Sequence, residues 1–325
     1  MTTNRRAMTI AAAAACLGMA PALLAQPSAK VWRIGVLLHN FRLERLRLRA
    51  LLPEVGLEEG RNLQFEIRST QGQLDRLDAL AAELVAAKVD LIVAPNNTEV
   101  LAAKRATQSI PILMLFAAAP VETGLVASLA RPGGNVTGTT TNAPELAGKM
   151  VEILRETVPR MSRIVFLNEP EYPGMALYQR SAEQAAAAYG LKAATLPVRG
   201  PADIDEALRS LERQRPDGVL VAMTGAIVGN YRRIVEFMAV QRLPAIYSTA
   251  FPVRDGGLVA YAPDFNAMAR RNLAMIDKIL KGVRPADIPV EEPAEFELVV
   301  NLKTARSLGL TVPTSILVRA SEVLQ

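Results

Sequence analysis

GLVASLARPGGNVTG, residues 124–138, is the most informative segment of this chain. It predicts a helical turn up to Arg131, a sharp corner at Pro132–Asn135 and a strand from Val136 onward. Proline fixes φ near −65° and glycine takes positive φ at little steric cost, so this order of residues favours a tight turn. The strand that follows, within 135–142, joins two halves of similar plan.

The half that precedes this segment alternates apolar strands with helices. Short apolar or alternating runs predict the strands, and apolar residues at helical spacing predict the helices between them. We expect strands at 32–38, 62–68, 90–94 and 111–116, and helices at 41–55, 74–88 and 98–107. This order predicts a parallel sheet with helices on both faces.

The pattern restarts after Asn142 and again alternates helices with strands. Helices are expected at 144–157, 175–189, 202–213 and 226–240, and strands at 163–167, 192–197, 218–222 and 245–247. The remaining sequence predicts a strand at 257–261, a helix at 265–281, a proline-rich connector at 285–293, a strand at 296–301 and a helix at 302–308. The sequence therefore predicts two α/β lobes, each a doubly wound parallel sheet.

Three segments resemble one protein family. The run at 124–138, ILKGVRPADIPVE at 279–291 and FELVVNLKTA at 296–305 are similar to segments of ABC transporter solute-binding proteins of the tryptophan/tyrosine-uptake type. The resemblance covers nearly all of 32–325 and implies a type I periplasmic binding protein fold with an interlobe cleft. It implies interdomain connections near 138–142, 260–264 and 284–292, and so a first lobe of 31–140 plus 261–285 and a second lobe of 141–260 plus 286–325.

The first residues have the pattern of an export signal. Arg5 and Arg6 precede an uncharged apolar run that ends near Ala25, which predicts a signal peptide over residues 1–25 and a periplasmic protein. The paired arginines leave the twin-arginine and general secretion routes both open. Cys16, the only cysteine, lacks the leucine three residues earlier that is typical of a lipid-modification site, so a lipid anchor is not expected.

Several functional classes find no support in the sequence. The chain has one histidine, His39, and neither an H-E-x-x-H nor a G-x-S-x-G motif, so we expect no enzyme, no metal and no cofactor. Gly133 and Gly134 do not form a phosphate-binding motif. The formal charge of +5 includes Arg5 and Arg6, and no basic stripe is interleaved with aromatic residues, so no nucleic-acid partner is expected.

Candidate ligand-binding residues follow the strands, because ligands bind outside the carboxyl ends of the strands in open α/β sheets. Asn and Thr side chains with a helix N-terminus suit a carboxylate, Glu169 or Glu171 suits an ammonium group, and aromatic rings suit an apolar side chain. The predicted binding residues are Asn40, Asn96, Asn97, Thr98, Phe116, Asn168, Glu169, Tyr172, Thr224, Tyr247, Thr249 and Phe251.

Structural alternatives remain open for several of these residues. For residues 96–98 the alternative role is to cap the following helix, and for Phe116 it is to belong to the core. For Thr224 and Thr249 the alternative role is to cap the segments that follow them. The chain also departs from the family near the cleft, with Ala119 where an Asp is common and Ala260-Tyr261-Ala262 in place of Ser-Tyr-Gly.

The sequence therefore predicts the exported solute-binding component of an ABC importer. We expect a small solute, an amino acid or a related compound, to bind in the cleft by hinge closure, and ABC permease subunits with a separate ATPase to be the partners. A periplasmic ligand-sensing module that partners a receptor or kinase is the alternative, and the sequence does not separate the two.

Overall fold

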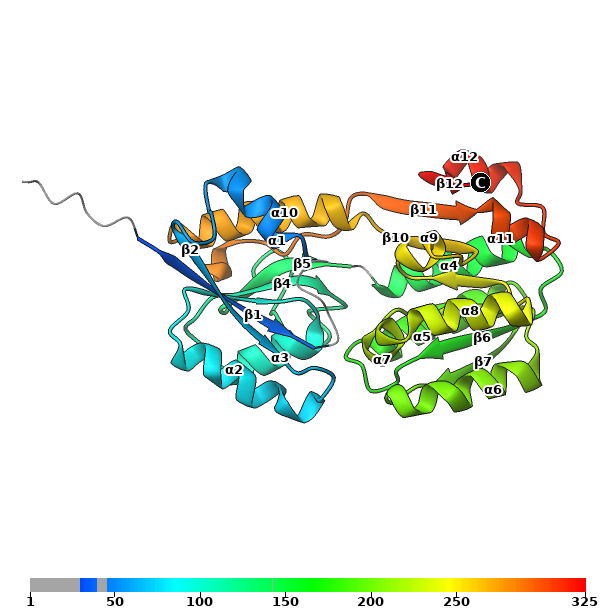
Figure 1. Ribbon diagram of the computed structural model, residues 1–325, viewed down its shortest axis with the longest axis horizontal. Coiled ribbons are helices and arrows are strands. Elements are labelled where there is room, and N and C mark those ends of the chain that lie inside the picture. Colours follow the sequence, from blue (N-terminus) through cyan, green and yellow to red (C-terminus); the bar gives the residue numbers. More distant parts are fainter. Residues whose placement is uncertain (1–29, 40–45, 142) are drawn as a thin grey trace, which may run out of the picture.

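Apolar runs build two sheets in two lobes of a computed structural model that describes residues 30–39, 46–141 and 143–325 (Figure 1). The first sheet is wholly parallel, with the order β2-β1-β3-β4-β5. Its strands are β1 (Trp32–Leu38), β2 (Leu63–Ser69), β3 (Leu91–Ala94), β4 (Ile112–Ala117) and β5 (Val136–Thr140). The expected signal peptide lies outside the described residues. Among the residues that are described, no helix is long and apolar enough to cross a bilayer.

Helices cover both faces of the first sheet, because successive strand residues point to opposite faces. On one face Ile34 and Leu113 pack with Leu273 and Ile276, and on the other Ile92 and Met114 belong to a second buried cluster. The covering elements are α1 (Leu48–Leu51), η2 (Leu52–Val55), η3 (Leu74–Arg76), α2 (Leu77–Ala86), α3 (Asn97–Ala106), α10 (Phe265–Leu280) and η5 (Pro285–Asp287).

The second sheet has the order β12-β11-β10-β9-β8-β6-β7. It is parallel except between β10 and β11, which are antiparallel. Its strands are β6 (Arg163–Asn168), β7 (Lys192–Pro197), β8 (Gly218–Val221), β9 (Ala245–Tyr247), β10 (Val259–Pro263), β11 (Phe296–Asn301) and β12 (Glu322–Leu324). The antiparallel pair brings the beginning of β11 to the edge at which the parallel strands end.

Helices also cover both faces of the second sheet, and their side chains pack with those of the strands in two buried clusters. They are α4 (Ala143–Thr157), α5 (Met175–Ala188), η4 (Pro201–Asp203), α6 (Ile204–Gln214), α7 (Gly225–Gly229), α8 (Tyr231–Gln241), α9 (Phe251–Arg254), α11 (Leu302–Ser307) and α12 (Thr314–Arg319). The two α/β lobes confirm the predicted fold class.

Two predicted helices differ from the structure. In place of one helix over 41–55, the described part holds the short α1 followed by the 3₁₀ turn η2, where Pro53 lies in the first turn. In place of one helix over 226–240, α7 and α8 meet at Asn230, whose side chain bonds the carbonyl of Ala226 at 2.8 Å. Such a side chain competes with the backbone for its hydrogen bonds.

The 124–138 segment forms the predicted corner, but the residues before the corner differ from the prediction. Gly133 has φ +79°, and Asn135 ties the corner to the end of α3 by donating to the carbonyl oxygens of Thr107 and Ile110. The residues before the corner form hydrogen-bonded turns in place of the expected helical turn, with Leu125 N–H bonding the carbonyl of Pro120.

Three segments cross between the lobes. The chain leaves β5 for α4, returns from β10 to α10 at Asp264, and passes finally from the first lobe to β11 through 292–295 (Figure 1). Ile288 and Val290 are buried in the clusters of the first lobe, so the last crossing lies later than the expected boundary at 285. We therefore propose lobes of 30–140 plus 264–291 and 141–263 plus 292–325.

Candidate functional site

A cavity of about 460 Å³ lies between the lobes, and both lobes contribute its walls. This volume falls in the range of small-molecule sites, which are commonly apolar with a few polar groups. Six of the predicted binding residues line it: Asn96, Phe116, Tyr172, Thr224, Thr249 and Phe251. The carboxyl ends of the strands therefore meet at this cavity, as the topology requires.

Aromatic side chains from both lobes line the cavity. Phe116, at the end of β4, meets Phe265 edge to face with ring centroids 4.9 Å apart. Phe251, in the second lobe, meets Tyr231 in the same way at 4.7 Å. Phe116, Phe265 and Phe251 all line the cavity, so a solute between the lobes contacts rings from both sides. Edge-to-face pairs hold the rings in defined orientations.

The N-terminus of α3 reaches the same cavity through Asn96. The Asn96 side chain makes no capping bond to the helix, so the capping alternative is wrong for this residue. Glu99 reaches back to Asn96 and accepts the backbone N–H of His39 at 3.0 Å. Burial outweighs these bonds and raises the pKa of Glu99 to about 8. A buried carboxyl group whose pKa is raised therefore lies directly behind Asn96 in the first lobe.

Tyr172 of the second lobe contacts the first lobe. Burial raises the pKa of its phenol, as do the nearby acidic side chains of Glu99 and Glu169, while a hydrogen bond from the backbone N–H of Asn97 opposes them. The phenol therefore lies against the N-terminus of α3. Two residues further on, Gly174 packs on Ala118 of the first lobe.

Glu169 is the buried acid of the second lobe. Its Oε1 accepts the backbone N–H of Ala226 at 2.8 Å at the start of α7. Its Oε2 is buried without a hydrogen bond in the described part of the chain, and burial raises its pKa. Thr224 lies close enough to oppose that rise, in a geometry too poor to satisfy either group. A side chain at Gly225 would place Cβ 2.3 Å from Oε2, so glycine makes room for this carboxylate.

The other predicted residues lie elsewhere. Asn97 is fully buried. Its side-chain amide donates to the carbonyl of Ala118 and accepts from the N–H of the same residue, both at 2.7 Å. Tyr247 is fully buried in a core cluster of the second lobe, because β9 is a central strand. The cavity walls include none of the following: Asn97, Thr98, Asn168, Glu169 and Tyr247. Asn40 lies outside the described residues.

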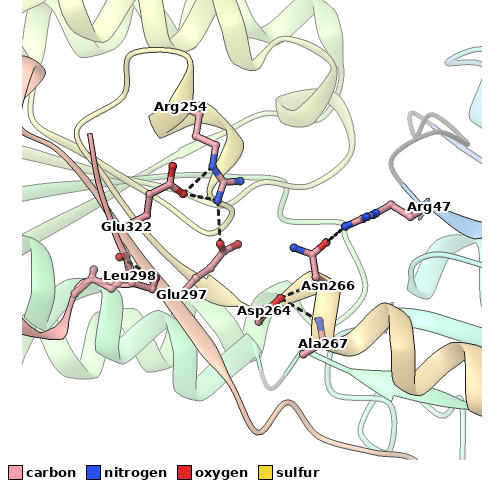
Figure 2. Close-up of polar contacts among 9 residues, drawn as sticks. Arg47, Arg254, Asp264, Asn266, Ala267, Glu297, Leu298 and Glu322 are labelled. Carbon is pink, nitrogen blue, oxygen red and sulfur yellow. Dashed lines mark hydrogen bonds and ion pairs between the residues drawn. The ribbon is translucent and has the colours of Figure 1, made fainter. Parts of the chain in front are cut away.

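Sequence reasoning missed the polar end of the cavity beside the crossings, shown in Figure 2. Arg254 donates to Glu322 at 2.7 Å and to Glu297 at 3.2 Å, and Arg47 of the first lobe donates to Asn266 at the start of α10. Burial raises the pKa of Glu297, and Arg254 opposes it. Four of these residues line the cavity: Arg47, Arg254, Asn266 and Glu297.

The residues that the structure describes do not form a metal centre at this site. No group of three or more His, Cys, Asp or Glu side chains is placed to hold a metal ion there. His39 does not line the cavity, and its Nδ1 lies 2.7 Å from Thr70 Oγ1. The fold and cavity together are those of a two-lobed solute-binding protein.

Known proteins are similar to this chain in fold and in sequence. A Streptococcus pneumoniae ABC domain solved in complex with L-Trp is 25% identical, with a TM-score of 0.84 over 91% of this chain and 100% of that one. A conserved domain protein from Vibrio cholerae has a TM-score of 0.82 at 24% identity, over 91% and 99%. A tyrosine-binding protein from Clostridioides difficile is 26% identical over 259 residues, which is 80% of this chain and 74% of the relative.

Residues 46–324 match the family model described as ABC transporter substrate binding protein, and the chain belongs to that family. This confirms the family resemblance. The family is one of binding proteins, and the expectation of a protein that is not an enzyme is confirmed with it.

Proposed function

We propose that this protein is the exported solute-binding component of an ABC importer and that its solute is an aromatic amino acid. The observation that carries the proposal is the interlobe cavity itself, walled by Phe116, Phe265, Phe251 and Thr224. Next to Thr224 but outside the cavity wall, Glu169 Oε2 is buried without a hydrogen bond among the described residues. Rings suit an aromatic side chain, and a buried carboxylate oxygen without a donor suits an ammonium group. Two relatives support the class of solute, one named a tyrosine-binding protein and one solved with L-Trp.

The polar groups at the carboxyl ends of β3, β6, β8 and β9 suit the zwitterionic head of the solute. The ammonium group lies at Thr224 on the cavity wall and is drawn toward Glu169 Oε2, which is buried next to Thr224 just outside that wall. Thr249, whose hydroxyl is also buried without a partner among the described residues, and Asn96 from the other lobe donate to the carboxylate. Thr224, Thr249 and Glu169 each gain in the complex a hydrogen bond that they lack among the described residues.

Binding favours the closed arrangement of the lobes, because the solute contacts both walls only when they are close. Asn96 and Phe116 come from the first lobe, and Thr224 and Phe251 come from the second. A solute with higher affinity for the closed form shifts the equilibrium toward it. The closed form then docks on membrane permease subunits, and a separate ATPase supplies the energy.

Isothermal titration and thermal unfolding with L-tryptophan, L-tyrosine and L-phenylalanine test the proposal. A solute at 100 times its Kd adds about 2.7 kcal/mol to the free energy of unfolding. Phe116→Leu should weaken binding, whereas Phe237→Leu, in a partly buried residue packed on the second-lobe core, should not. If none of the three amino acids shifts the unfolding transition, the proposed solute class is wrong.

A further inference from the structure

The cavity has two polar ends, and the sheet topology separates them. Thr224 follows β8, and Glu297 lies on β11, where it is paired with Ala262 at the carboxyl end of β10. Because β9 and β10 lie between β8 and β11, the two ends are three strand spacings apart, or roughly 14 Å across the sheet. The rings of Phe251 and Phe265 line the same cavity.

The far end offers an acceptor and donors that have no partner among the described residues. Glu322 engages Nε and Nη2 of Arg254, and Glu297 Oε2 accepts from Nη2, which leaves Arg254 Nη1 and Glu297 Oε1 without a bond among the described residues. Across the cavity, Asn266 accepts from Arg47 through Oδ1 and keeps its amide N–H groups (Figure 2).

The charges at this end disfavour an ionic group. A solute carboxylate would meet Glu297, with the carboxylates of Glu322 and Asp264 close enough to raise its pKa. A solute ammonium group would meet the guanidinium groups of Arg254 and Arg47. A neutral group that both donates and accepts hydrogen bonds suits the free groups at this end.

We infer that the solute is an aromatic amino acid with a neutral hydrogen-bonding substituent on its ring, a phenolic hydroxyl or a close equivalent, and that Glu297 and Arg254 select it. The inference rests on the proposed function. The substituent donates to Glu297 Oε1 and accepts from Arg254 Nη1. An unsubstituted ring leaves both groups without a partner in the closed cavity, which costs affinity.

Titration of the wild-type protein with L-tyrosine and L-phenylalanine tests this selection. We expect tyrosine to bind at least tenfold more tightly. Glu297→Gln should reduce that ratio at least fivefold while leaving phenylalanine affinity unchanged, and Arg254→Lys should act in the same direction. Glu322→Gln is the matched control, because Glu322 bonds the same arginine but does not line the cavity, and it should keep the ratio.

The outcomes separate this inference from the proposed function. Equal affinities for tyrosine and phenylalanine in the wild-type protein, or a ratio that Glu297→Gln and Arg254→Lys both leave intact, overturn only the selection at the far end. Absence of binding by every aromatic amino acid overturns the proposed function and this inference together. Thermal unfolding of each variant shows whether a lost ratio reflects a lost fold.

Discussion

Gly174 of the second lobe lies directly against Ala118 of the first: a Cβ built at Gly174 would be 3.4 Å from the Ala118 carbonyl oxygen and 3.5 Å from its Cβ. Gly174 has φ +87°, and Ala118 is held from behind by the amide of Asn97. The two lobes therefore touch through a glycine on one side and a braced backbone segment on the other. A methyl group just fits in this contact, and a larger side chain does not.

Gly174→Asn should weaken solute binding by about tenfold, or about 1.4 kcal/mol, because the longer side chain keeps the lobes apart. Asparagine tolerates positive φ, so the cost to folding is small. Gly190→Asn is the control: Gly190 has φ +67° at the other end of α5, and a Cβ at this position would have no atom within 4 Å. Titration calorimetry that shows equal affinity for both variants would contradict the lobe contact.

Glu169→Gln should lower the affinity for an amino acid by 10- to 100-fold, because a hydrogen bond to a charged group contributes about 1.5–3 kcal/mol. The neighbouring Glu171→Gln should leave affinity unchanged, since Glu171 is exposed and forms only a 3.7 Å ion pair with Arg199. A decisive comparison uses an amino acid and its analogue without the ammonium group. If Glu169→Gln weakens both equally, Glu169 does not bind that group.

Glu99→Gln should change the pH dependence of stability. The pKa of Glu99 is raised from 4.5 to about 8 in the folded state, so between these pH values the folded protein holds a proton that the unfolded chain has lost. Its contribution to stability is therefore fully present below pH 4.5 and falls as pH rises toward 8, by up to about 1.4 kcal/mol per pH unit.

The variant lacks this titration. The free energy of unfolding of Glu99→Gln should therefore exceed that of the wild type more at pH 8 than at pH 5. Urea unfolding at pH 5, 6.5 and 8 measures the difference. His39, whose pKa is lowered by burial, titrates in the opposite sense but is present in both proteins. A constant difference between the two proteins across this range would show that Glu99 is ionised throughout.

Lys88→Gly should stabilise the protein by about 0.5–1 kcal/mol. Lys88 is exposed just beyond α2 and has φ +53°, a conformation that costs most residues about 1–2 kcal/mol and costs glycine little. The gain is reduced because glycine also makes the unfolded chain more flexible. Lys88→Ala keeps the strained Cβ and should show no gain in urea unfolding, which separates backbone strain from loss of the side chain.

The order of strands and helices was predictable because buried parallel strands are short apolar runs separated by amphipathic helices. The β12 strand was not, since Glu322–Leu324 is too short to show a period and pairs only because β11 lies beside it. The direction of β11 was equally hidden, because strand periodicity is the same in parallel and antiparallel pairs.

The site was predictable at the level of loops and not of side chains. The rule that ligands bind at strand ends located Asn96, Phe116, Thr224 and the start of α9, all of which reach the cavity. It did not distinguish Asn96, which lines the cavity, from its neighbour Asn97, which is fully buried. Consecutive residues at a helix start point in different directions, and only packing decides which one faces the cleft.

Because β11 is antiparallel to β10, Glu297 lies beside the last crossing between the lobes. Asn266 lies beside the crossing at Asp264. A hydrogen bond from Asp264 N–H to the Glu295 carbonyl, at 2.9 Å, joins the two crossings. In a molecule whose lobes turn about these segments, groups near the pivot keep their spacing while distant groups separate. The end of the cavity at Glu297 is then preassembled before closure, and the end at Thr224 and Asn96 is completed by it. Under the proposed closure, a solute would enter ring first and have its charged head enclosed last.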